Sequence, residues 1–235
     1  MPTWSPEEPL FAGRIVAVLA AAHRLRAGSK AAGSSKALRG KNLALLSSVS
    51  PGYEVSPLHR AAEDLGARVA EVRFEPNGSG QPDVGTLARL LGRMYDAIDC
   101  DSLPPTIVRR IEKEAGVPVY GGLGQDTHPA RAIADLMTLC EQGPPSGTHK
   151  TLLFVGNPRT PRSSVLLSAA SELGIALRVA GGVEATLEGV AFVVNATRAP
   201  DWSLHVQGRP VDEGLRSENH RCVIQTVLLD TIHRT

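Results

Sequence analysis

Aromatic residues make up only 4% of this 235-residue chain, and cysteine occurs three times, at Cys100, Cys140 and Cys222. Because so few aromatics accompany 42% hydrophobic residues, the composition favours an α/β core packed from Ala, Leu and Val over a β-sandwich. Three separated cysteines fit neither a disulfide framework nor a zinc site. We therefore expect no disulfide, no metal and no cofactor.

The chain also lacks an excess of charge and a long apolar run. Its 25 Lys and Arg balance 24 Asp and Glu, giving a net charge of +1, which provides no attraction to nucleic acid or an anionic membrane. The longest apolar stretch, IVAVLAAAH at residues 15–23, is far shorter than a span of about 20 residues. It also lacks the flanks of a signal peptide. We expect a cytoplasmic protein that binds neither nucleic acid nor a membrane.

Short apolar runs alternate with helical patterns along the chain, after a first helix at 12–27 and a flexible connector at 28–36. Strands are predicted at 43–46, 69–74, 97–100, 117–120, 151–155, 176–180 and 190–195. Helices are predicted at 57–65, 84–94, 105–115, 128–140, 162–173 and 183–188, and from 218 to about 233. This alternation indicates an α/β fold with parallel sheets covered on both faces.

The Pro/Gly/Ser-rich break EQGPPSGTHK, residues 141–150, marks a domain boundary. We predict a first domain over 1–141, a shortened second domain over 150–217 with a loop from 196, and a C-terminal helix over 218–235. Three strands and one convincing helix make the second unit thin. Since small domains bury proportionally less surface, we expect it to lean on the first domain or on another subunit.

Three stretches carry a family resemblance: ALRGKNLALL before residue 47, LARLLGRMYDAIDCDSL leading into AGVPVYGGLGQDTHPARAIADLMTLCE, and SENHRCVIQTVLLDTI near the end. In content, order and spacing they resemble the ornithine/aspartate carbamoyltransferases, the ornithine branch most closely. The resemblance implies two parallel-sheet α/β units of carbamoyltransferase type, a C-terminal helix that returns to the first unit, and a trimer. It also implies attack of an amine on carbamoyl phosphate, a reaction whose developing charge requires cations and N–H donors.

The phosphate loop of the family carries Ser-x-Arg-Thr-Arg between a strand and a helix, where a helix N-terminus also favours anions. The chain has SSVSPGYEV at residues 47–55. Ser50 is kept, Tyr53 and Val55 replace the two arginines, and Glu54 would repel a dianion. Neither replacement can pair with phosphate as arginine does. A later family arginine falls on Asp101. Ser50, Gly52 and Tyr53 remain candidate ligand-binding residues.

The family's His-Pro-x-Gln motif survives partly, because His128 and Pro129 match while Arg131 stands at the glutamine position. His128 and Arg131 are the candidate catalytic residues. The alternatives stay open: His128 is also expected as a packing histidine at a helix start, and Arg131 as a solvent-facing residue of the first turn.

The amino-acid half departs further from the family. Its Gly-Asp-Gly-x-Asn-Asn loop becomes GNPRTP, residues 156–161, and its Ser-Met-Gly loop is absent. The candidate ligand-binding residues here are Asn157, Arg159, Thr160, Ser164 and His205. Arg159 and Arg162 could bind an anion at a helix N-terminus, or be surface residues of a turn. Glu218, Asn219 and His220 replace Glu-Asn-Arg, with a structural role as the favoured interpretation.

Two functions are compatible with this pattern. The first is a non-catalytic or regulatory scaffold that has lost carbamoyl-phosphate and amino-acid binding. The second is a repurposed enzyme, possibly still a carbamoyl- or acyl-type transferase, that acts on an amino-acid-derived substrate. The partners implied are copies of the same chain, as a trimer, and a small amino-acid-like or anionic ligand.

Overall fold

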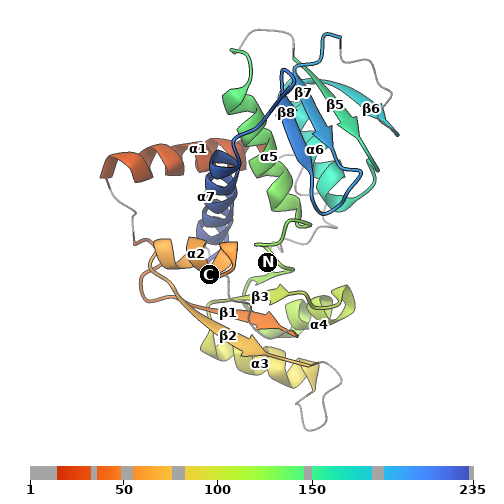
Figure 1. Ribbon diagram of the computed structural model, residues 1–235. Helices are drawn as coiled ribbons and strands as arrows, with labels where there is room; N and C mark the ends of the chain where they lie inside the picture. The colour runs from red at the N-terminus through yellow and green to blue at the C-terminus, as the bar shows by residue number, and fades with distance from the viewer. Residues whose placement is uncertain are drawn as a thin grey trace. The chain divides into compact units, whose positions relative to one another are not determined.

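The computed structural model describes residues 15–32, 36–48, 55–75, 83–145, 150–181 and 188–232. Ser50, Gly52 and Tyr53, and most of the helix predicted at 183–188, lie outside these ranges. The described chain divides into two units (Figure 1). One comprises residues within 25–125 and 224–232, and the other comprises residues 15–24 and those within 126–223. The domain limits expected from the sequence, 1–141, 150–217 and 218–235, remain a prediction.

The first unit contains a four-stranded parallel sheet in the order β2-β1-β3-β4. Its strands are β1 (Asn42–Ser47), β2 (Arg68–Arg73), β3 (Ala97–Asp101) and β4 (Val119–Tyr120). The crossover helices are α2 (Pro57–Asp64), α3 (Val84–Met94) and α4 (Pro105–Ala115). Figure 1 shows α2 on one side of this sheet and α3 on the other, as right-handed crossovers on both sides of β1 require.

Local sequence signals set the limits of these helices. The Ser56 hydroxyl caps α2 by accepting from the His59 N–H, and Pro57 follows in the first turn. The Asp83 carboxylate caps α3, and α4 ends at Gly116, whose φ of 71° suits glycine. The helices α3 and α4 pack together, and their buried side chains form one hydrophobic cluster with strands β1 and β3.

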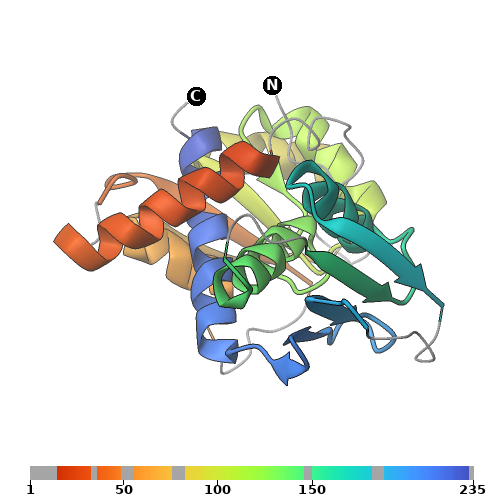
Figure 2. The same ribbon diagram turned by 90° about the horizontal axis from the view of Figure 1, so that it is seen from above.

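The second unit contains a mixed five-stranded sheet in the order β6-β5-β7-β8-β9. Its strands are β5 (Thr151–Val155), β6 (Ala176–Ala180), β7 (Phe192–Asn195), β8 (Ser203–Val206) and β9 (Arg209–Pro210). The first three are parallel, while β8 and β9 pair antiparallel. Its helices α5 (Pro129–Gln142) and α6 (Pro161–Glu172) pack against each other, and α6 contacts β6 (Figure 2).

The loop predicted at 196–217 is wrong in its middle, where β8 and β9 form a hairpin. Gln207 and Gly208 connect them with φ angles of 49° and 78°, the left-handed pair of a tight hairpin turn. A non-glycine residue at the first of these positions hid that turn from sequence inspection. Leu204 and Val206 nonetheless alternate with more exposed neighbours, as one buried face of a strand requires.

Two long helices contribute residues to both units: α1 (Ile15–Ala32) and α7 (Glu213–Ile232). The helix α1 continues through residues predicted as a flexible connector, and α7 begins five residues before the predicted position. Within the first unit, the Tyr120 hydroxyl hydrogen-bonds Thr231 of α7. In the part of the chain that the structure describes, no helix is long and apolar enough to cross a membrane.

Candidate functional site

The start of α5 places His128 at the N-cap. Its Nδ1 accepts a hydrogen bond from the Ala130 N–H at 3.1 Å, and Pro129 occupies the next position. Since Nδ1 is an acceptor, the proton of the neutral ring lies on Nε2. Burial lowers the pKa of His128 to about 4, so the imidazole is neutral at pH 7. It therefore adds no positive charge to the site.

Arg131, one turn later, is 8% exposed, so the expected solvent-facing orientation is wrong. Its Nε lies 3.2 Å from Asp126 Oδ1 and 3.7 Å from Asp135 Oδ1. Both distances suit ion pairs, but neither contact has the alignment of a hydrogen bond, and Nε finds no acceptor among the described residues. The glutamine position of the family motif thus holds a buried cation between two carboxylates.

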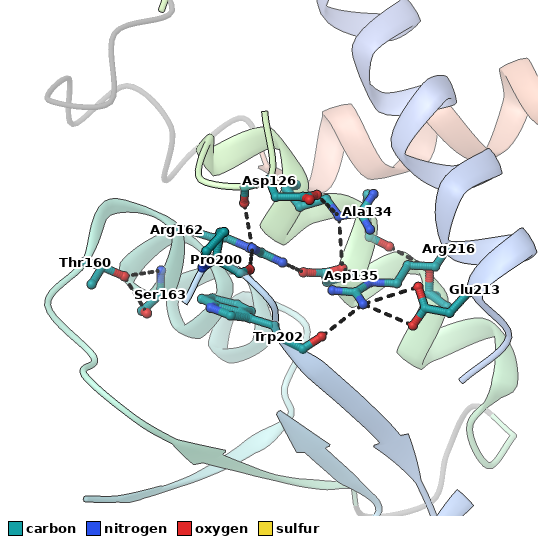
Figure 3. Close-up of polar contacts among 12 residues, drawn as sticks. Asp126, Ala134, Asp135, Thr160, Arg162, Ser163, Pro200, Trp202, Glu213 and Arg216 are labelled. Atoms are coloured by element: carbon teal, nitrogen blue, oxygen red, sulfur yellow. Dashed lines mark hydrogen bonds and ion pairs between the residues drawn. The ribbon is translucent and has the colours of Figure 1, made fainter. Parts of the chain in front are cut away.

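Asp135 is the centre of this arrangement and is fully buried. Its Oδ2 accepts from Arg162 Nη2 at 2.7 Å, and its Oδ1 accepts from Arg216 Nε at 2.8 Å. Burial acts to raise the pKa of Asp135, but the charges of Arg162, Arg216 and Arg131 outweigh it and hold the pKa below its usual range. We call Asp135 and these three arginines the Asp135 cluster. Figure 3 shows Arg162 and Arg216 on either side of Asp135.

Arg162 joins α6 to two loops. Its Nη1 donates to the carbonyl oxygens of Asp126 at 2.6 Å and Pro200 at 2.9 Å, and its guanidinium lies 3.9 Å from the centroid of the Trp202 ring. This side chain, predicted as either an anion ligand or a surface residue of the turn, is 3% exposed. The stacked, multiply hydrogen-bonded position is one that arginine fills better than lysine.

Arg216 brings α7 into the same cluster. Besides Asp135, it donates from Nη1 to the Trp202 carbonyl at 3.0 Å and to Glu213 at 3.1 Å. One turn further on, Asn219 Nδ2 donates to Thr138 Oγ1 at 3.0 Å and Glu141 Oε2 at 3.1 Å. These contacts agree with a structural role for the start of α7, the favoured interpretation of Glu218, Asn219 and His220.

His220 is 2% exposed. Burial, with smaller effects from the positive charges of Arg131 and Arg162, lowers the pKa of His220 to about 3. Its Nε2 has no hydrogen-bond partner among the described residues, and the same holds for Nε2 of His128. Two neutral histidines thus stand beside a group of three buried arginines.

Two of the predicted ligand residues of the 156–164 loop, Asn157 and Thr160, hydrogen-bond the backbone. Asn157 Oδ1 accepts from the Arg159 N–H at 3.0 Å, and Thr160 caps α6 by accepting from the Ser163 N–H at 3.2 Å. Ser164 and Arg159 are exposed. His205 lies on β8, opposite Val193 of β7. Side-chain capping of this kind stabilises helix starts and turns without any ligand.

In the first unit, the carboxylates at the end of β3 are already engaged. Asp101 accepts from Gln125 Nε2 at 2.6 Å, and buried Asp99 accepts from the N–H groups of Gly122 and Leu123 at 3.0 and 2.9 Å. Burial raises the pKa of Asp99 to about 7. Cys100 is also buried, and burial raises the pKa of its thiol, which makes it an inert core residue.

Sequence inspection named His128 and Arg131 as candidates but did not single out Asp135, which pairs with Arg131, Arg162 and Arg216. Asp135 falls within the apolar pattern of α5, and a carboxylate on that face is a signal for a buried ion pair. The partners could not be found in this way, because Arg162 and Arg216 lie 27 and 81 residues from Asp135 along the chain.

Comparison with known proteins identifies the origin of this architecture. The profile of the aspartate/ornithine carbamoyltransferase carbamoyl-P binding domain matches residues 9–141. Ornithine carbamoyltransferase from Pyrococcus furiosus is 22% identical with a TM-score of 0.56, the match covering 72% of this chain and 63% of that one. This chain thus spans less than two thirds of that relative.

Two aspartate carbamoyltransferase structures match over more of their length. The catalytic subunit of aspartate transcarbamoylase from M. jannaschii is 13% identical with a TM-score of 0.66, over 95% of both chains. A putative aspartate carbamoyltransferase from Trypanosoma cruzi is 14% identical with a TM-score of 0.64, over 94% of this chain and 92% of that one. At these identities the likeness concerns the fold, which is the predicted α/β arrangement of two sheet units.

Proposed function

We propose that this chain, which belongs to the aspartate/ornithine carbamoyltransferase family, is a non-catalytic or regulatory member that does not transfer a carbamoyl group to ornithine. The observation that carries the proposal is the Asp135 cluster. Three buried arginines of the second unit share one buried carboxylate, so their charge already serves the protein rather than a substrate.

The chemistry of carbamoyl transfer explains why this matters. Negative charge develops on the carbonyl oxygen and on the leaving phosphate, and removing one directed donor costs about 10²–10³-fold in rate. The segment between Ser47 and Leu58 contains no Arg or Lys. His128 is neutral at pH 7, and Arg131 faces Asp126 and Asp135. We infer that neither His128 nor Arg131 replaces the arginines that the family resemblance places in this loop.

A direct assay tests this proposal. The purified chain is incubated with carbamoyl phosphate and ornithine, and citrulline is compared with that of a heat-inactivated sample. Calorimetric titration with carbamoyl phosphate, and with inorganic phosphate as the control, measures binding separately. We expect no citrulline above the control and no binding at millimolar ligand. Citrulline that scales with protein concentration would overturn the proposal.

A second candidate function is favoured by the buried, unpartnered Nε2 of His128. An N–H donor at that position suits a carbonyl or carboxylate oxygen, as a repurposed transferase acting on an amino-acid-derived substrate would need. Micromolar binding of carbamoyl phosphate in the same titration would move this candidate to first place.

Assembly and location form the remaining part of the proposal. The family resemblance favours a homotrimer, and the composition favours a cytoplasmic protein. Light scattering after gel filtration distinguishes a trimer from a monomer of 24.9 kDa. A monomer at all concentrations would contradict the trimer without bearing on the catalytic proposal.

A further inference from the structure

The sheet of the second unit ends in two edge strands of different character (Figure 1). At one edge, β9 consists of Arg209 and Pro210 alone, and a very short strand with a proline protects an edge against further pairing. At the other edge, β6 is five residues long, with the sequence ALRVA and Arg178 as its single charge. No described strand pairs with the outer side of β6. Only the β6 edge therefore offers a full strand to a partner.

The backbone of β6 shows which groups face this outer side. The Ala176 N–H donates toward β5, to the Lys150 carbonyl oxygen at 2.9 Å. Backbone polar groups of successive residues point to opposite sides of a strand, so Leu177 and Val179 direct their N–H and C=O groups outward. The Ala180 carbonyl oxygen fits this alternation, because it accepts from the residue that follows β5 at 3.1 Å. An added strand can thus hydrogen-bond two residues of β6.

The side chains of the same two residues extend an apolar face of the sheet. In the register of the two strands, Leu177 lies beside Leu152 of β5, and Val179 lies beside Phe154. Leu152 and Phe154 are fully buried, whereas Leu177 and Val179 are 37% and 52% exposed. Apolar residues of an added strand would lie next to Leu177 and Val179 and remove their surface from water.

Arg178 determines which kind of strand fits this edge. Its side chain is exposed, and its Nη1 donates to the Glu188 carbonyl oxygen at 3.2 Å, but no carboxylate pairs with it among the described residues. Antiparallel pairing with β6 of a second copy over all five residues would place Arg178 opposite its own counterpart. Like charges in that position are destabilising, while an acidic residue would be favourable. The charge therefore favours a different chain over a second copy.

We propose that the outer edge of β6 binds an extended peptide segment of a partner protein, with an acidic residue between two apolar ones. The segment would add a strand to the sheet, a common mode of peptide recognition. Its main chain would hydrogen-bond Leu177 and Val179, and its acidic residue would lie opposite Arg178. This inference goes beyond the absence of carbamoyl transfer and does not depend on it, because peptide binding and citrulline formation are measured separately.

The test uses the full chain labelled with ¹⁵N and ²H, and two synthetic peptides, GTVEVTG and GTVKVTG. Both sequences are symmetric about their central residue, so either strand direction presents the same pattern. Each peptide is titrated to about 5 mM while the amide signals of Leu177 and Val179 are followed by NMR. We expect saturable shifts of both signals with GTVEVTG, half-complete below about 1 mM. The affinity for GTVKVTG should be at least about threefold lower, because its lysine faces Arg178.

Arg178→Glu is the test variant, and Arg209→Glu on β9 is the matched control with the same change of charge at the other edge of the sheet. Arg178→Glu should reverse the preference and bind GTVKVTG at least about threefold more tightly than GTVEVTG. Arg209→Glu should keep the preference of the parent chain. An exchange of charges on both partners that restores binding would show that the peptide residue lies opposite position 178.

Four results would overturn the proposal. The first is no shift of the two amide signals up to about 5 mM GTVEVTG, which would exclude all but negligible affinity. The second is equal binding of both peptides by the parent chain, and the third is an unchanged preference in Arg178→Glu. The fourth is a shift of the same signals with protein concentration alone, which would assign the edge to a second copy. The titrations of the parent chain decide the question even if Arg178→Glu does not fold.

Discussion

At the scale of single residues, Asp135 has the largest predicted effect. It is fully buried and compensates Arg162 and Arg216 at 2.7 and 2.8 Å. In Asp135→Asn, a neutral amide would face three buried cations, and we expect a loss of about 3–5 kcal/mol in the free energy of unfolding. Urea denaturation in a Trp4→Phe background, followed by the fluorescence of Trp202, which lies beside Arg162, measures this loss.

Asp126→Asn is the matched control, because the Asp126 carboxylate also faces Arg131 but its side chain is 53% exposed. An exposed ion pair contributes about 0–1 kcal/mol, and the carbonyl of Asp126 that accepts from Arg162 is unchanged by this substitution. If the two variants lost equal stability, Asp135 would not be the centre of the cluster.

The residue scale is also where sequence inspection reached its limit. His128 and Arg131 stood out because a short motif frames them, and the structure puts both in a buried polar environment. Thr160 and Asn157 stood out for the same reason, yet their side chains cap a helix and a turn. The identity of a residue at a motif position does not say which partner its side chain will find in the folded chain.

At the scale of elements, α3 and α4 of the first unit approach each other closely at Gly92. A Cβ on Gly92 would lie 1.7 Å from the carbonyl oxygen of Ala115, a backbone atom that cannot move without displacing α4. We expect Gly92→Ala to lose at least about 2 kcal/mol of stability, because overpacking exceeds the gain in helix propensity. Thermal unfolding by circular dichroism measures the loss.

Gly28→Ala in α1 provides the opposite case. A Cβ on Gly28 would meet nothing within 4 Å, so the substitution is expected to stabilise the protein by about 0.5–1 kcal/mol through helix propensity alone. A stabilised Gly92→Ala would show that α3 and α4 can separate at little cost.

Most elements were predictable, but the β8–β9 hairpin was not. The strands β1, β3, β5 and β6 are visible in the sequence as short apolar runs between turns, and the cap residues Ser56 and Asp83 mark helix starts. The β8–β9 hairpin was missed because Gln207 adopts a positive φ that sequence patterns assign to Gly or Asn. The antiparallel pairing of β8 with β7 stabilises that turn. This pairing is not visible in the local sequence of the turn.

At the scale of the whole molecule, buried ionisable groups determine how stability varies with pH, and they act with opposite signs. The folded-state pKa values of His128 and His220, about 4 and about 3, lie below the 6.5 of the unfolded chain. Unfolding therefore takes up protons between these values, and stability is lost as the pH falls from 6.5. Asp99 has a raised folded pKa of about 7, so its contribution is lost as the pH rises from 3.8 to 7.

These opposing effects belong to different units, since both histidines lie in the second and Asp99 in the first. The two tryptophans are Trp4 and Trp202, so a Trp4→Phe background leaves Trp202 as the reporter of the second unit. Its unfolding midpoint in urea should fall as the pH decreases from 7 to 4. Asp99→Asn should leave this profile unchanged while altering the pH dependence seen by circular dichroism.

His128→Asn isolates the contribution of a single histidine to this pH dependence. The asparagine side chain keeps an acceptor for the Ala130 N–H, because asparagine is a good N-cap, but it does not titrate. A shift of the histidine pKa from 6.5 to about 4 corresponds to about 3 kcal/mol between pH 7 and 4. The variant should therefore lose about 3 kcal/mol less stability than its parent over this range, as reported by Trp202. Parallel pH profiles for variant and parent would mean that His128 is solvated in the folded chain and titrates as an ordinary histidine.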